Sequence, residues 1–171
     1  MRLKDKVNYL NERRDLHQLH FENELNVKIQ LFCHLFEALG WDYTCPSQSR
    51  FEHPKVGENA ATGVHLDRKL KPTILFETKG IKEDINNHIE QTLNFFSVED
   101  SIKVAILTNM VDMYFFSDFK TSGVMDETPF YRIHLPSFTQ QDVEFLEQFQ
   151  RDYFLDHYNV LYAKWKGKYT L

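Results

Sequence analysis

The hydrophobic residues near the start of the chain follow helical spacing. Leu3, Val7 and Leu10 predict a short first helix. A stronger stripe steps by four, three, four and three residues and predicts a helix that ends at Gly40. Residues 41–45 then predict a short strand. The stripe consists of Leu25, Ile29, Phe32, Phe36 and Leu39.

Strand patterns dominate the middle of the chain. Residues 64–66 and 73–76 predict a hairpin, in which Pro72 begins the second strand. A nearly continuous apolar run at residues 102–107 is typical of a strand covered on both faces. The remaining expected elements are a helix from about Asp84 with Ile85, Ile89, Leu93 and Phe96 buried, a turn at Thr108 and Asn109, strands at residues 113–116 and 130–135, and a helix capped by Thr139 with Val143, Leu146, Phe149 and Tyr153 on its inner side. This order predicts an α/β fold with a mixed sheet flanked by helices.

Length and composition predict one domain. The chain has 171 residues, of which 42% are hydrophobic, enough for a single core. We expect one domain over residues 1–171, with its core at about residues 20–135 and a C-terminal helical segment at about 139–171. No apolar segment is long enough to span a bilayer and no signal-peptide core is present, so we expect a cytoplasmic protein with no membrane partner. Cys33 and Cys45 are expected to be reduced thiols.

The chain is acidic, with a net charge of −5. This balance argues against binding nucleic acid through bulk electrostatics, so any contact with DNA must be local. The strongest candidate for chemistry is Glu77, which ends an apolar strand two residues before Lys79. Alternate strand residues share a face, so both side chains project from one side of a sheet. A carboxylate that holds a divalent cation beside a lysine that contacts a phosphate is the minimal set for metal-dependent phosphodiester hydrolysis.

Several segments, in order and spacing, resemble the N-terminal nuclease domain of type I restriction enzyme R subunits and their stand-alone relatives, a branch of the PD-(D/E)XK nuclease superfamily. The similarity covers about residues 3–160 and implies a restriction-endonuclease-like fold. The segments are Ala-Leu-Gly-Trp (38–41) in the helix that follows Glu24, Pro-Thr-Ile-Leu-Phe-Glu-Thr-Lys (72–79), Gln-Thr-Leu-Asn-Phe (91–95), Ala-Ile-Leu-Thr-Asn (105–109), Tyr-Phe-Phe-Ser-Asp (114–118) and Met-Asp-Glu-Thr-Pro-Phe (125–130).

The resemblance assigns roles to individual residues. It implies that Glu77 binds Mg²⁺ and that Lys79 orients or activates the attacking water. Mn²⁺ is a possible substitute, because it accepts mixed nitrogen and oxygen ligands. Glu24 would be an accessory acid near the metal. Gln91 would match the glutamine of the family's Gln-x-x-x-Tyr motif, with Phe95 in place of the tyrosine. From the residues alone, the preferred interpretation of Glu24 is an exposed acid in the first turn of a helix, and Gln91, His88 and Phe95 form a solvated second helix face.

One departure from the family is serious. Counting back from Glu77 puts the family's first acidic ligand at Gly63, and glycine cannot bind a metal. Asp67 is about 13 Å further along the strand. His65 is nearer, but imidazole suits Mg²⁺ poorly, and an ordinary half-exposed strand histidine is the preferred interpretation. Glu58 could fold back from a loop.

Two functions of different classes follow. The chain is a metal-dependent DNA endonuclease domain of restriction or phage-defence type, or it is a catalytically degenerate relative that acts as a DNA-binding, scaffold or regulatory protein. An unrelated α/β interaction module is a third, less favoured reading. The sequence has no Gly-x-x-x-x-Gly-Lys-[Ser/Thr] phosphate loop, so a helicase motor or specificity subunit would be a separate partner. The oligomeric state is open.

Overall fold

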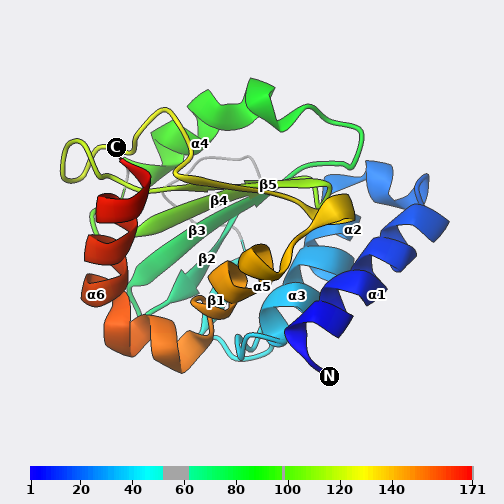
Figure 1. Cartoon of the computed structure of the whole chain (residues 1–171), viewed down its shortest axis with the longest axis horizontal. Helices are drawn as coiled ribbons and strands as arrows, with labels where there is room; N and C mark the ends of the chain where they lie inside the picture. The colour runs from blue at the N-terminus through cyan, green and yellow to red at the C-terminus, as the bar shows by residue number, and fades with distance from the viewer. Residues whose placement is uncertain (52–61, 98, 171) are drawn as a thin grey trace.

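A mixed sheet forms the centre of the fold. The structure is a computed structural model that describes residues 1–51, 62–97 and 99–170. Within this part, six strands lie in the order β1 to β6 (Figure 1). Only β3 and β4 are parallel, and every other neighbouring pair is antiparallel. The strands are β1 (Ser49–Phe51), β2 (Thr62–Leu66), β3 (Pro72–Thr78), β4 (Val104–Thr108), β5 (Asp112–Phe116) and β6 (Tyr131–His134).

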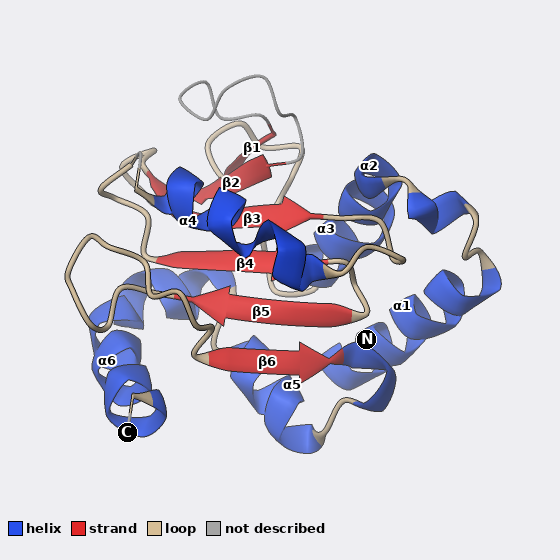
Figure 2. Cartoon of the chain, turned by 90° about the horizontal axis from the view of Figure 1, so that it is seen from above, coloured by secondary structure: helices blue, strands red, loops and turns tan. Residues whose placement is uncertain are grey.

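Helices cover both faces of the sheet. Figure 2 shows α4 (Ile89–Phe96) across one face, which we call the α4 face, and the other helices behind the opposite face, which we call the helical face. Among the described residues, no helix has the length and apolar character needed to cross a membrane. The other helices are α1 (Leu3–Leu16), α2 (Glu24–Val27), α3 (Cys33–Glu37), α5 (Gln140–Glu147) and α6 (Arg151–Tyr169), with a π-helical segment η2 (Lys28–Phe32) and 3₁₀ turns η1 (His20–Glu22), η4 (Ile85–His88) and η5 (Leu135–Ser137).

Strand alternation divides the core into two layers. Along β3, Ile74 and Phe76 belong to the larger cluster on the helical face, whereas Leu75 belongs to the cluster under α4. All five residues of β4 are buried, as the continuous apolar run predicts. The mixed α/β sheet flanked by helices and the hairpin of β2 and β3 are therefore confirmed.

The helix expected to carry Leu25 and Ile29 in the core is built differently. These two side chains are 51% and 46% exposed, while Val27 and Leu31 are completely buried. The cause is η2, because a π-helical turn contains one more residue than an α-helical turn and rotates the buried face. The predicted stripe is correct from Phe32 onward and wrong at Leu25 and Ile29.

The helix expected to begin after Thr139 is two helices. Thr139 forms the expected cap, as a capping box with Asp142. However, α5 ends at Glu147 and a separate 19-residue helix, α6, follows. Tyr153 lies in α6 and is 43% exposed, so its predicted place in the core is wrong. The buried residues of α6 are Phe154, Leu161 and Trp165.

The strand expected at residues 41–45 is a turn. Asp42 accepts hydrogen bonds from both the backbone nitrogen and the hydroxyl of Thr44, at 2.8 and 2.6 Å. Such local side-chain bonds compete with the strand ladder. The first strand, β1, begins only at Ser49.

Candidate active site at the carboxyl end of β3

Glu77 is a completely buried carboxylate on the α4 face. Its Oε2 accepts a hydrogen bond of 3.0 Å from the Thr92 hydroxyl of α4. Its Oε1 lies 2.7 Å from Lys79 Nζ in an ion pair but accepts no hydrogen bond from the described residues. One carboxylate oxygen is thus satisfied by the fold, and the other faces only a cation.

Lys79 connects the candidate residues. Its backbone nitrogen donates to Thr108 O at 2.9 Å, which extends the pairing of β3 with β4 by one residue. Its Nζ donates to Gln91 Oε1 at 3.5 Å and lies 3.8 Å from Glu24 Oε2. The structure therefore brings together all four residues proposed from the sequence. We call this group, with Thr92, the Glu77 cluster: Glu24, Glu77, Lys79, Gln91 and Thr92.

Two features of the Glu77 cluster escape the sequence analysis. The alternation argument places Glu77 and Lys79 on one face, but it gives no sign that Glu77 has no exposed surface. The hydrogen bond from Thr92 is also missed, although Thr92 directly follows Gln91. Phe95, expected on a solvated helix face, is buried in the core under α4. Phe95 is therefore a packing residue.

Helix caps position the outer members of the cluster. Asn23 caps α2 by accepting from the backbone nitrogens of Leu25 and Asn26, so that Glu24 begins the helix. The backbone oxygen of Glu24 accepts a hydrogen bond of 3.2 Å from Thr78. This contact fixes the start of α2 against the end of β3, and the half-exposed Glu24 carboxylate reaches Lys79 from there.

The chain after Lys79 passes close to the segment before α2. A Cβ at Gly80 would lie 2.1 Å from the backbone oxygen of Glu22, so only glycine fits. Next to it, the Ile81 nitrogen donates to Phe21 O at 2.9 Å. Lys82 and Glu22 form an exposed ion pair across the same contact.

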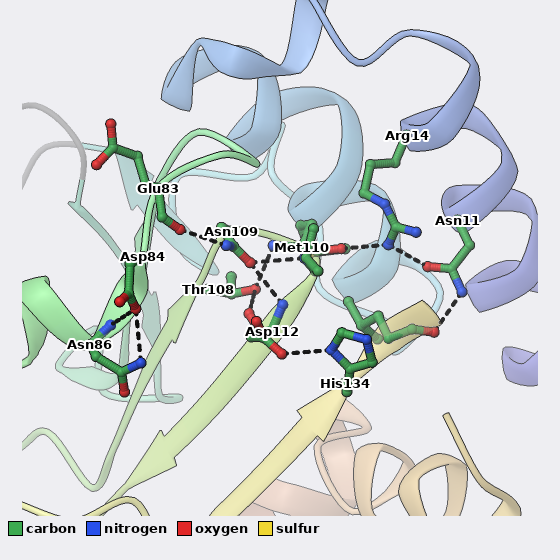
Figure 3. A network of polar contacts seen from close by, with 12 residues as sticks. Asn11, Arg14, Glu83, Asp84, Asn86, Thr108, Asn109, Met110, Asp112 and His134 are labelled. Carbon is green, nitrogen blue, oxygen red and sulfur yellow. Dashed lines mark hydrogen bonds and ion pairs between the residues drawn. The ribbon is translucent and has the colours of Figure 1, made fainter. Parts of the chain in front are cut away.

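A polar network supports this loop from the other side (Figure 3). Asn109, in the turn between β4 and β5, donates to Glu83 O at 2.9 Å and accepts from the nitrogens of Val111 and Asp112. The buried Arg14 of α1 donates to Met110 O at 2.8 Å. The turn therefore joins α1 to the loop that follows Lys79. None of these contacts joins the turn to a side chain of the Glu77 cluster, so we interpret the role of the turn as structural.

Carboxylates outnumber lysines around the site, so it is not strongly positive. Lys79 contacts Glu77 and Glu24, Lys82 pairs with Glu22, and the half-buried His88 contacts the exposed Glu83 at 3.2 Å. Within the described residues, no group of three or more His, Cys, Asp and Glu side chains is arranged to hold a metal. A cation at this site would therefore depend on Glu77 and Glu24.

Residue 63 does not lie where the sequence-based count expects an acidic ligand beside Glu77. Gly63 pairs with Phe76, and a Cβ at Gly63 would lie 2.2 Å from Cζ of that ring, on the helical face. Position 63 therefore points away from Glu77, and an aspartate there could not complete the site. The residue that the register pairs with Glu77 is Thr62.

The other substitutes considered for this acid also lie elsewhere. Asp67 accepts backbone hydrogen bonds from Lys69 and Lys71 within the hairpin turn. Glu58 is outside the described residues. His65 is completely buried, so the expectation of a half-exposed histidine is wrong.

His65 lies in an aromatic enclosure on the helical face. Its ring stacks on Trp41 at 4.3 Å between centroids and packs against Phe36 and Phe76, and its Nε2 shares a hydrogen bond of 2.7 Å with the Tyr43 hydroxyl. Burial holds the pKa of His65 well below its usual value, which favours the neutral ring.

The two cysteines are free thiols. Burial raises the pKa of the Cys33 thiol to about 12, so it is protonated at neutral pH and is not poised as a nucleophile.

Comparison of the chain with protein-family models, with curated proteins and with solved structures found no match. The function is therefore argued from the geometry of the Glu77 cluster.

Proposed function

We propose that the protein is a metal-dependent nuclease domain of restriction or phage-defence type that hydrolyses phosphodiester bonds in DNA. The observation that carries the proposal is the meeting of a buried carboxylate, a lysine and a second carboxylate at the carboxyl end of β3. The order of an antiparallel hairpin, a helix and a parallel strand around this point supports a restriction-endonuclease-like fold.

Glu77 and Glu24 are the residues that would hold Mg²⁺ or Mn²⁺. Glu77 Oε1 suits a cation because it is buried, accepts no hydrogen bond from the described residues and lies beside the Lys79 ammonium. Mg²⁺ is commonly bound by one or two carboxylates together with waters and substrate phosphates. A site with two carboxylates should therefore bind the cation more tightly when DNA is present than when it is absent. When bound, the cation would supply Lewis acidity toward a phosphate oxygen and a water.

The other members of the cluster act on position and charge. Thr92 holds Glu77 in one orientation through Oε2. Lys79 would orient the attacking water and offset the negative charge that develops on the phosphate. Gln91 would hold the Lys79 ammonium within this group.

A catalytically degenerate DNA-binding or scaffold protein is the second candidate. Two observations favour it: the Glu77 cluster contains only two carboxylates, and both Lys79 and the neighbouring Lys82 are already paired with carboxylates. In this alternative the cluster would be a structural ion pair, and DNA would bind without being cut.

Cleavage of supercoiled plasmid by the purified protein, with Mg²⁺ or Mn²⁺, tests the proposal. Glu77→Gln and Lys79→Met should each lower the rate about 100-fold or more. Glu83→Gln changes an exposed carboxylate of the neighbouring loop and should leave the rate unchanged. Wild-type cleavage that survives Glu77→Gln would rule out this site.

Absence of cleavage combined with DNA binding at low salt would favour the second candidate. Because the register pairs Thr62 with Glu77, Thr62→Asp is the substitution that adds a carboxylate at the matching position. A slow wild-type rate should rise in this variant.

A further inference from the structure

Lys79 already lies where a cation would bind Glu77. Its Nζ is 2.7 Å from Glu77 Oε1, closer than to Gln91 Oε1 at 3.5 Å or Glu24 Oε2 at 3.8 Å. The other oxygen of Glu77 is occupied by the Thr92 hydroxyl. Oε1 is therefore the oxygen of this buried carboxylate that a cation could bind. In the present structure, the Lys79 ammonium neutralises its charge.

A divalent cation and this ammonium compete for one oxygen. Two like charges this close repel strongly in a buried site, so a cation that binds Oε1 must move Lys79. The lysine side chain is flexible enough to move. Two acceptors already lie within 4 Å of its Nζ: the Glu24 carboxylate, which would itself be drawn to the cation, and the neutral amide oxygen of Gln91.

We propose that Lys79 is a built-in competitor for the cation site of Glu77, and that Gln91 is the positioning residue that accepts the Lys79 ammonium when a divalent cation displaces it. This inference rests on the proposed cation site. It explains why consecutive residues of α4 face the cluster, since Thr92 holds Glu77 while Gln91 holds Lys79. An amide suits this role because it accepts an N–H without adding a charge that would compete for the lysine or the metal.

Calorimetric titration with MnCl₂ or MgCl₂ alone tests the competition, with the electron paramagnetic resonance signal of Mn²⁺ as a second measure of binding. Lys79→Met removes the competitor and should bind Mn²⁺ at least about 5-fold more tightly than wild type. Lys82→Met, which removes an exposed lysine paired with Glu22, is the matched control and should have little effect. If Lys79→Met does not fold, Lys79→Gln carries the same expectation.

A double substitution tests the role of Gln91. Gln91→Leu should weaken Mn²⁺ binding about 5- to 10-fold, because the displaced ammonium loses its acceptor. Asn94→Leu, an exposed position on the same helix, should not. In the Lys79→Met background, Gln91→Leu should no longer weaken Mn²⁺ binding. If Gln91 bound the metal directly, Gln91→Leu would weaken binding in that background too.

Three results would overturn the inference: unchanged or weaker binding by folded Lys79→Met and Lys79→Gln, a Gln91 effect that persists without Lys79, or no binding by any variant. The proposed function fails separately. If Lys79 competes with Mn²⁺ but DNA is not cleaved, the inference stands and the nuclease proposal is contradicted. If cleavage depends on Glu77 but Lys79 does not compete with Mn²⁺, the nuclease proposal stands and the inference is contradicted.

Discussion

Glu77 and His65 are both completely buried and lie on neighbouring strands, but their surroundings are opposite. Glu77 faces α4 among a lysine, a second carboxylate, an amide and a hydroxyl. His65 faces the other side of the sheet, stacked on Trp41, with one hydrogen bond to Tyr43. Both are candidate metal ligands in the sequence.

The difference shows that burial of a polar side chain does not by itself mark a functional site. In the Glu77 cluster, the Lys79 ammonium has other acceptors nearby, so the ion pair can rearrange when a ligand binds. Aromatic rings offer no such exchange, and a charge on His65 would be left without a counter-ion in the enclosure. The predictions below test this contrast, beginning with the largest expected effect.

Gly63→Asp should destabilise the protein by more than about 4 kcal/mol, because the side chain would clash with Phe76 and bury a carboxylate in the aromatic layer. Urea denaturation measures the loss. Gly167→Asp is the matched control, since a Cβ there meets no atom within 4 Å, and it should cost less than about 1 kcal/mol. A stable Gly63→Asp protein with raised nuclease activity would show that the register of β2 is wrong.

This position also marks the limit of the sequence argument. Alternation within one strand correctly places Glu77 opposite Ile74 and Phe76. Counting from one strand to the next does not place Gly63, because the count depends on the length of the turn and on the register shift between His65 and Leu66. Residue spacing therefore predicts the face on which a side chain lies within one strand more reliably than it predicts the residue paired with it on the next strand.

Lys79→Met should lower the free energy of unfolding by about 3 kcal/mol, because it leaves Glu77 buried without its counter-ion. Glu77→Gln in the same chain should recover part of this loss, as a double-mutant cycle in urea would show. Lys82→Met breaks an exposed pair and should cost less than about 1 kcal/mol. Equal costs for the two lysine substitutions would remove the distinction between the buried cluster and the surface.

Asn109→Ala should cost about 2 kcal/mol in the same assay. The substitution leaves Glu83 O and two backbone nitrogens of the turn without their side-chain partner. Asn86→Ala, at an exposed position, is the control and should cost under about 1 kcal/mol. If Asn109→Ala is as mild as its control, the network does not support the loop after Lys79.

The residue pattern predicts this turn but does not predict two helical features. The π-helical turn η2 leaves no simple spacing signal, because its extra residue only shifts the stripe partway along. The hydrophobic pattern of α6 is present, since Phe154, Leu161 and Trp165 keep helical spacing. However, α6 follows shortly after α5, and the pattern alone does not separate the two helices. The cluster itself is predictable to the level of residues brought together, whereas the burial of Glu77 depends on packing by α4.

The last and smallest effect concerns pH and the aromatic enclosure. Burial depresses the pKa of His65 below its ordinary value of 6.5, so the unfolded chain takes up this proton before the folded one as the pH falls. The stabilisation is complete above about pH 6.5 and is lost below it, with a slope of at most about 1.4 kcal/mol per pH unit. His65→Gln retains a polar side chain that can pair with Tyr43 but does not titrate, so its unfolding free energy should fall less than that of wild type between pH 7.5 and 5.5. His157→Gln, an exposed histidine of α6, should follow the wild-type curve. Parallel curves for wild type and His65→Gln would mean that the enclosure admits a charged ring, and that His65 is less different from the Glu77 cluster than its neighbours indicate.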